Sequence, residues 1–310
     1  MPAEFDLLVL GDANPDLVLR GDVDPAFGQA EKLVDEASLV VGGSGAIAAC
    51  GAARLGLRVA FAAVVGDDGF GRFMLDELAA RGVDTCGCVV DRHRPTGVSV
   101  ILSRGDDRAI LTAPGTIGDL RGELVDRDLL RSSRHVHVSS YFLQRSLRPD
   151  LPELFREAHA AGASTSVDPN WDPAGRWDGG LLELLGQTDC FFPNSVEARE
   201  IAGIDDVDVA AGVLAERGAI VAVKFGQGGG LVMAGQEVAR SESIATDVVD
   251  TTGAGDSFDA GFLAGRLNGW PLARCLRLAV ACGSLSTRAV GGTAGQPTME
   301  EALAALEGAP

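Results

Sequence analysis

The fold of this chain follows from one stretch, Val249-Asp250-Thr251-Thr252-Gly253-Ala254-Gly255-Asp256-Ser257-Phe258-Asp259-Ala260-Gly261. Three small residues, Gly253 to Gly255, precede an apolar pattern of helical period, which predicts a loop that turns into a helix. The first N–H groups of a helix have no partner within it, and the helix dipole adds partial positive charge there. Because small residues let a phosphate approach the backbone, the stretch predicts an anion site.

Asp256 lies in the first turn of this predicted helix and has two interpretations. Its carboxylate could take a proton from a hydroxyl while the N–H groups hold the phosphoryl group that the hydroxyl attacks. Alternatively, it only complements the helix dipole, as many first-turn acids do. The flanking glycines favour the first interpretation, because they are costly unless something must approach the backbone.

The string Asp250-Thr-Thr-Gly-Ala-Gly-Asp256 resembles the signature of the ribokinase-like (PfkB) sugar and nucleoside kinases. The resemblance implies an ATP-dependent kinase in which Gly253, Ala254 and Gly255 form the anion hole. Asp256 would be the base and would also contact the substrate. A monovalent cation such as K⁺ would lie near Asp250 and the Thr252 carbonyl.

The composition of the chain excludes some classes of binding partner. The net charge of its 310 residues is −18, which argues against binding to nucleic acid or to an anionic membrane surface. The six cysteines have no zinc-like spacing, so buried free thiols are expected. The sequence shows neither a signal peptide nor an apolar run of membrane length, and we expect a soluble cytoplasmic protein.

The acceptor side is predicted near the amino terminus. Asn14 and Asp16 follow a buried strand, and in the resembled family such a pair grips sugar hydroxyls. Gly42 and Gly43 would lie against the sugar in the same family. Where the family usually has an asparagine, this chain has Ile47, so one polar contact to the substrate is missing.

Two rival functions compete with the kinase. Gly43 to Ala48 fits the dinucleotide pattern G-x-G-x-x-A of an NAD(P)-dependent oxidoreductase. This interpretation ranks second, because it leaves the stretch Val249 to Gly261 without a role. The other rival is a sugar- or nucleotide-binding regulator that has lost catalysis, but the anion hole and base that it would lack are intact.

The nucleotide side is predicted from two further motifs. Asn194 and Glu197 read as a capping box, while the resemblance implies ATP binding by Asn194 and organisation of Mg²⁺ through water by Glu197. Lys224 begins a glycine-rich turn with Gly226 and Gly229, which on its own predicts a loose hairpin. The resemblance implies that this turn binds ATP together with Gly255. The adenine would border Val249, Cys282 and the loop 289–292.

Asp172 stands where the resembled family often has an arginine, a cation used near phosphates or acidic sugars. Arg176 could substitute only if its loop folds back. Together with the acidic chain, this change favours a neutral sugar as the substrate, with a nucleoside as the second choice.

Strand and helix patterns alternate from His135 onward, which predicts an α/β fold. We expect one domain over residues 1–310 with a three-layer α/β/α (ribokinase-like) architecture, a mostly parallel central sheet and a small β lid. Segments 12–41 and 95–113 would form the lid, and a lid with an apolar outer face would favour a homodimer. His135 and His137 share one strand face, and packing is a better explanation for them than metal binding, because no third ligand is evident.

Overall fold

The central sheet has nine strands in the order β15-β14-β13-β12-β11-β10-β1-β4-β6 in the computed structural model, which describes residues 3–104, 107–244 and 246–307. The strands are β1 (Leu7–Leu10), β4 (Val59–Ala62), β6 (Val83–Asp84), β10 (His135–Val138), β11 (Ser164–Val167), β12 (Cys190–Phe191), β13 (Ile220–Lys224), β14 (Gly230–Ala234) and β15 (Glu237–Ser241). Neighbours pair in parallel except that β14 runs antiparallel to β13 and β15. The predicted mostly parallel sheet is confirmed.

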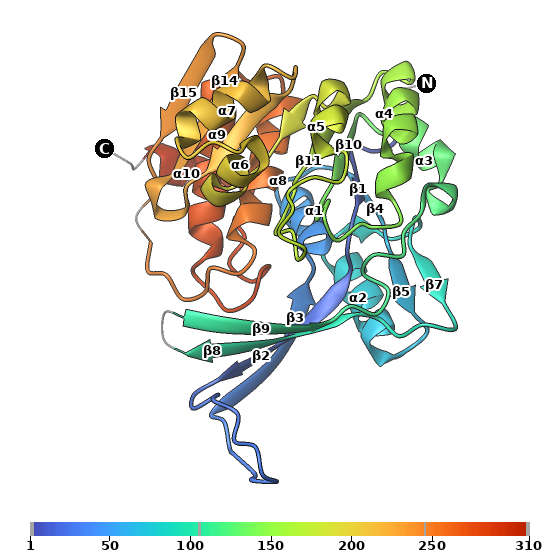
Figure 1. Ribbon diagram of the computed structural model, residues 1–310, viewed down its shortest axis with the longest axis vertical. Coiled ribbons are helices and arrows are strands. Elements are labelled where there is room, and N and C mark those ends of the chain that lie inside the picture. Colours follow the sequence, from blue (N-terminus) through green and yellow to red (C-terminus); the bar gives the residue numbers. More distant parts are fainter. Residues whose placement is uncertain (1–2, 105–106, 245, 308–310) are drawn as a thin grey trace.

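Helices cover both faces of this sheet (Figure 1). They are α1 (Ser44–Arg54), α2 (Gly69–Ala80), α3 (Arg127–Arg131), α4 (Leu151–Ala160), α5 (Leu181–Leu184), α6 (Ser195–Ala202), α7 (Val207–Ala215), α8 (Ala254–Leu267), α9 (Leu272–Ser286) and α10 (Met299–Glu307). Successive residues of a strand point to opposite faces. Leu8 and Leu10 therefore pack in one core with α3 to α7, and Leu7 and Val9 in the other with α1, α2 and α8 to α10. The three predicted layers are confirmed.

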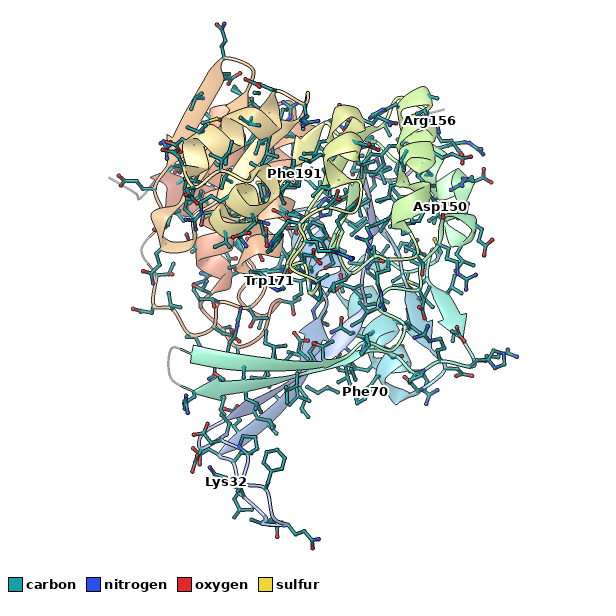
Figure 2. All side chains as sticks on the ribbon, viewed as in Figure 1. Lys32, Phe70, Asp150, Arg156, Trp171 and Phe191 are labelled. Carbon is teal, nitrogen blue, oxygen red and sulfur yellow. The ribbon has the colours of Figure 1, made fainter. Side chains whose placement is uncertain are left out.

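A second sheet projects from the body (Figure 1). Its strands are β2 (Asn14–Arg20), β3 (Glu36–Gly42), β8 (Val98–Arg104) and β9 (Asp107–Ala113), in the order β3-β2-β8-β9. They come from the two segments that the sequence assigned to the lid; residues 105 and 106 lie outside the described residues. Figure 2 shows Lys32 on the segment between β2 and β3 that extends beyond this sheet.

The apolar segment from Arg58 to Val65 contains two strands rather than one: β4 ends at Ala62, and β5 (Val64–Gly66) pairs with β7 (Val89–Asp91) in a separate sheet. The two halves have different partners, which periodicity cannot reveal. All six cysteines are free thiols, but Cys86 is exposed rather than buried.

The histidine pair packs as expected. The Nδ1 and Nε2 atoms of His135 lie 2.6 and 2.7 Å from the hydroxyls of Ser164 and Ser166. His137 is similarly bonded to Ser166 and Ser139, at 2.8 and 2.9 Å. Burial lowers the pKa of His135 to about 3 and that of His137 to about 4, so both rings are neutral parts of the core.

Parallel strands bring their carboxyl ends to one edge of the sheet, where ligands of open α/β sheets bind. Asp12 follows β1 there, Asp168 follows β11, and Lys224 ends β13. The amino termini of α1 and α8 meet the same edge. Side chains far apart in sequence therefore converge on one site. Among the described residues, no helix is both long enough and apolar enough to span a membrane.

Candidate active site

A cavity of about 690 Å³ opens at this edge of the sheet. Its walls come from α6, the β13–β14 turn, α8, α9 and the second sheet. The predicted residues that line it are Asn194, Glu197, Lys224, Gly226, Gly229, Gly253, Ala254, Gly255 and Asp256. Its volume falls within the usual range for small-molecule sites. The structure thus brings most of the predicted nucleotide and catalytic residues together.

The amino terminus of α8 forms one wall, and its geometry requires a glycine. Gly253 has φ 73°, in the left-handed region. A Cβ there would lie 2.7 Å from the Gly292 Cα and 2.8 Å from the Ile47 Cγ2. Ile47 is therefore a packing residue under the turn, which gives a structural reason for an apolar side chain at that position. The Ala254 N–H donates to the Thr251 carbonyl at 3.3 Å, so this member of the expected anion hole is shared with the turn.

Asp256 lies in the first turn of α8 and opens onto the cavity. Burial, followed by the nearby negative charge of Asp168, raises its pKa well above the ordinary value. The Ser44 hydroxyl, from the start of α1, hydrogen-bonds to it and partly offsets this shift. A carboxylate whose pKa is raised binds a proton more readily, as a general base requires.

Beneath the helix tip, Lys224 has a different environment from the one expected. Its Nζ lies 2.5 Å from Asp168 Oδ2 and 3.2 Å from Asp259 Oδ1, and both carboxylates are buried. The negative charges of these partners raise the pKa of Lys224 even though burial opposes the shift. The ammonium is thus already neutralised by protein groups, so its expected reach to ATP phosphates would compete with this pairing.

The same cluster bears on metal binding. Carboxylate oxygens of Asp168, Asp256 and Asp259 lie within 4.8 Å of one another, a spacing that could hold an ion. The Lys224 ammonium already bonds two of these three groups. Glu197 lines the same cavity, and its carboxylate also offers oxygen ligands of the kind that suits Mg²⁺.

Glu197 also confirms the capping interpretation. The Asn194 side chain accepts hydrogen bonds from the Val196 and Glu197 N–H groups, and Glu197 Oε2 accepts one from the Asn194 N–H at 2.8 Å. Burial and the charge of Asp168 raise the pKa of Glu197 to about 7. A cation bound in the cavity would stabilise its ionised form.

The acceptor-side residues lie on β2, not in the loop after β1. Asn14 Nδ2 donates to Asp16 Oδ1 and Ser99 Oγ, both at 3.3 Å, and Asn14 and Asp16 are buried. They do not line the cavity; Ser44 and Asp256 border it instead. A separation of 3.3 Å is long for hydrogen bonds of this kind.

The double glycine makes room for these acids rather than exposing backbone to the cavity. A Cβ on Gly42 would lie 2.2 Å from the Asp16 carboxyl carbon. Gly43 has φ 80°, and a Cβ there would meet the Asp12 carbonyl oxygen at 2.7 Å.

The dinucleotide interpretation of Gly43 to Ala48 is contradicted by the same region. The Asp12 carboxylate accepts the Ser44 and Gly45 N–H groups at 3.2 and 3.0 Å, so these donors are taken by the protein itself. The strand before α1 is β3, which pairs in the antiparallel direction with β2. A dinucleotide fold needs a parallel strand and a helix terminus that can receive pyrophosphate.

The signature loop is organised by Asp250. Its Oδ1 accepts the Thr252 N–H and its Oδ2 accepts the Gly291 N–H, both at 2.9 Å. Burial opposes ionisation, but these backbone bonds outweigh it and lower the pKa of Asp250. The Arg108 Nη1 atom from β9 lies 3.7 Å away. Asp250, which the resemblance places beside a monovalent cation, thus accepts hydrogen bonds from two backbone N–H groups and has a guanidinium nearby.

The residues expected to border the adenine, Val249, Cys282 and the loop 289–292, do not line the cavity. One face of α9 and its carboxyl end line the cavity instead, through Val280, Gly283, Ser284 and Thr287, a set with helical spacing. Cys282 falls outside this spacing and is buried in the core against Gly261.

Asp172 has a structural role, because its side chain holds the loop that follows it. Its carboxylate accepts the N–H groups of Ala174, Arg176 and Trp177 at 2.8 to 2.9 Å. Arg176 is exposed and is not in the cavity wall. Neither side chain supplies the arginine of the resembled family.

Several residues of the site had no role assigned from the sequence. Asp168 and Asp259 hold Lys224, and Ser44, Asn170 and Arg108 line the cavity. The sequence pattern could have revealed Asp259, because it is an acid on the otherwise apolar face of the predicted helix. No such pattern indicates Arg108, because its position depends on how the second sheet folds over the body.

The family described as pfkB family carbohydrate kinase matches residues 5–299. The chain belongs to the PfkB family of carbohydrate kinases. It is accordingly a phosphotransferase with an alcohol group as acceptor. An ATP-dependent ribose-1-phosphate kinase of Halopiger xanaduensis is 33% identical over 305 residues, covering 97% of each chain. A 2-dehydro-3-deoxygluconokinase of Bacillus subtilis is 30% identical over 266 residues, covering 82% of each.

Solved structures agree with this membership. A putative Ribokinase II from E. coli in complex with ATP and Mg²⁺ has a TM-score of 0.87 at 25% identity, covering 98% of this chain and 99% of that one. An adenosine kinase from Sinorhizobium meliloti has a TM-score of 0.86 at 30% identity, covering 99% and 100%. The ribokinase-like fold of this PfkB chain is thus established.

Proposed function

We propose that this PfkB protein transfers the γ-phosphoryl group of ATP to a hydroxyl of a sugar, with Asp256 as the general base. The observation that carries the proposal is the position of Asp256 at the tip of α8, where its carboxylate and the first N–H groups of the helix share one cavity. The acceptor hydroxyl would lose its proton to Asp256. The Gly253, Ala254 and Gly255 backbone would stabilise charge on the phosphoryl oxygens.

Magnesium and ATP complete the proposal. Mg²⁺ bound with ATP would neutralise phosphate charge, and Glu197 would orient it through water. Asn194, Lys224, Gly226 and Gly229 would surround the nucleotide. We also propose K⁺ beside Asp250 and the Thr252 carbonyl; equal rates in K⁺ and in a tetramethylammonium salt of the same ionic strength would exclude it.

We favour a neutral sugar as the acceptor. The predicted acceptor side presents Asn14, Asp16 and Ser99, which suit hydroxyl groups, and Asp12 adds negative charge nearby. Some relatives are named for anionic substrates and others for ribose, fructose or adenosine. A panel of ribose, fructose, adenosine, ribose 1-phosphate and 2-dehydro-3-deoxygluconate would decide, and turnover with the anionic sugars alone would contradict our choice.

The decisive variant is Asp256→Asn, which keeps the shape of the side chain but removes the base. We expect kcat to fall by roughly 10²–10⁴-fold. The rise in melting temperature with ATP–Mg²⁺ should remain, because bound ligand stabilises the native state. Asp208→Asn is the matched control, since Asp208 is also a first-turn acid but on α7. Near-normal turnover of Asp256→Asn would remove Asp256 from the mechanism.

We further propose that two copies associate through the outer face of the second sheet. Strand register places Leu17, Leu39, Val100 and Leu111 in one row across the four strands. The buried Asp16 lies in the adjacent row and faces the body, so this row faces outward. Leu39 and Leu111 are 40% and 60% exposed. Such an apolar face is typical of an interaction surface.

A further inference from the structure

Asn170 is the centre of a hydrogen-bond network at the carboxyl edge of the central sheet. Its Nδ2 atom donates to the hydroxyls of Ser44 and Ser140, both at 3.0 Å. Its Oδ1 atom accepts the Trp171 N–H at 2.7 Å. Because a backbone N–H can bond only to the amide oxygen, this contact fixes which way the amide faces. Both protons of Nδ2 therefore point at serine oxygens.

This amide determines where the two hydroxyls send their own protons. A serine oxygen that accepts a proton from Asn170 can still donate its O–H to a different group. The Ser44 hydroxyl bonds to Asp256, and the Ser140 hydroxyl bonds to Asp12. Ser44, Asn170 and Asp256 all line the cavity. One side-chain amide thus orders the hydroxyl donors of two acids.

The backbone around the Ser44 hydroxyl is also fixed. Asp12 accepts the Ser44 N–H at 3.2 Å and the Gly45 N–H at 3.0 Å, at the start of α1. Asp168 accepts the Asn170 N–H at 2.7 Å. The two acids follow β1 and β11 of the central sheet. The hydroxyl and the amide that orients it are therefore anchored to the same rigid edge.

The backbone is strained where this network meets. Among the described residues, four other than glycine have a positive φ, and Asn170 at 53° and Ser140 at 55° are two of them. Asparagine tolerates this conformation, whereas serine adopts it at a cost. Such strain persists only where the surroundings over-determine it, and it is concentrated at functional sites. The two residues bond to each other, which places the strain beside the proposed base.

We propose that Asn170 and Ser44 are positioning residues for phosphoryl transfer: Asn170 orients the Ser44 hydroxyl, which aims the Asp256 carboxylate at the acceptor. The inference rests on the proposed function. One Asp256 oxygen accepts the Ser44 O–H, which leaves the other oxygen to receive the acceptor proton. The acceptor oxygen bonds to the γ-phosphorus as the bond to the β,γ-bridging oxygen breaks, and ADP leaves with that electron pair. Asn170 and Ser44 gain and lose no proton.

The first test combines Asn170→Gly with Ser44→Ala in the full chain. Glycine adopts a φ of 53° without steric cost, so Asn170→Gly removes the amide and keeps the backbone conformation. We expect each single variant to lower kcat by about 10–10²-fold, with the KM for ATP and for the acceptor within a few-fold of wild type. The double variant should be no slower than the slower single variant, because both act through one contact. A loss equal to the product of the two single losses would overturn the inference.

Gln29→Gly is the matched control for Asn170→Gly. Gln29 also has a positive φ, 61°, but it is exposed on the segment between β2 and β3, so the variant should keep wild-type kcat. Equal melting temperatures would show that the variants fold; if Asn170→Gly melts lower, the Ser44 variants carry the test. Ser44→Thr restores the hydroxyl and should recover kcat to within a few-fold of wild type. A folded Ser44→Thr protein as slow as Ser44→Ala would contradict the inference.

The last test asks whether the hydroxyl acts through Asp256. In the Asp256→Asn background, adding Ser44→Ala should change kcat by less than about twofold, since no base remains to be aimed. A loss as large as in the wild-type background would assign Ser44 to another group and overturn the inference. So would a raised acceptor KM at unchanged kcat, because Ser44 would then bind the substrate. Failure of the proposed function itself looks different: wild type would then phosphorylate none of the acceptors.

Discussion

At the scale of single residues, the surroundings of the acids shift their pKa values in opposite directions. Asp250 and Asp172 accept backbone N–H groups, and their pKa values are lowered even though burial acts in the opposite direction. Asp16 and Glu197 are more deeply buried, and the pKa of each is raised to about 7. Asp250 and Asp172, whose pKa values are lowered, hold loops in shape. Asp16 and Glu197, whose pKa values are raised, lie where a substrate or a cation is proposed to bind.

Asp16 leads to a prediction on pH. Burial and the charge of Asp12 raise its folded-state pKa from 3.8 to about 7. Between these values the folded state binds the extra proton, so the contribution of Asp16 to the free energy of unfolding falls as pH rises. Wild type should therefore lose stability relative to Asp16→Asn as pH rises. The difference between their free energies of unfolding should shift in favour of the variant by roughly 2–4 kcal/mol from pH 4 to pH 8. Urea unfolding at several pH values checks this, and parallel pH curves for the two proteins would contradict it.

At the scale of elements, a buried ion pair ties α8 to the central sheet. Lys224 at the end of β13 holds Asp259 of α8 and Asp168 after β11. The pairing lies directly below the helix tip that carries Asp256. It fixes the tip against the sheet, because the charges would be costly to separate within the core.

Removing the cation should therefore destabilise the fold. Lys224→Met leaves two buried carboxylates without their partner, and we expect a loss of about 3–5 kcal/mol in the free energy of unfolding at neutral pH. The loss should shrink as pH falls, because protonation removes the unpaired charges. Lys32→Met is the control, since the only other lysine pairs with the exposed Asp22. Equal midpoints of urea unfolding for both variants would show that the cluster contributes little.

At the scale of the whole molecule, the second sheet has two unlike faces. Its inner rows carry Asn14, Asp16, Ser99 and Arg108 toward the body, while its outer row is apolar. A cavity of about 590 Å³ continues this outer face past Leu39, Val98 and Phe70. Figure 2 shows Phe70 where the second sheet joins the body. An association through this face would place two sites on either side of one paired sheet.

The proposed dimer predicts the effect of a charge in this face. Leu111→Glu should convert a dimer into a monomer, because it buries an unpaired carboxylate in the interface. Light scattering after size-exclusion chromatography measures the mass. Val209→Glu is the control, since Val209 is 53% exposed on α7, away from the second sheet. A wild-type protein that is monomeric at high concentration would refute the proposed association.

The sequence by itself determined the small-residue turn before α8, the layered α/β fold and the family. These features depend on local rules: small residues before an amphipathic helix, and periodicity that alternates between strand and helix. The capping box of Asn194 and Glu197 was equally local, because its partners are three residues apart.

Only the tertiary structure decided which charges meet. Lys224 faces Asp168 and Asp259, Arg108 reaches Thr252, and Ile47 packs beneath Gly253. These pairs are separated by 35 to more than 200 positions, and no spacing rule relates them. Their meeting depends on the register of the strands and on how the second sheet lies on the body, which are properties of the packed chain.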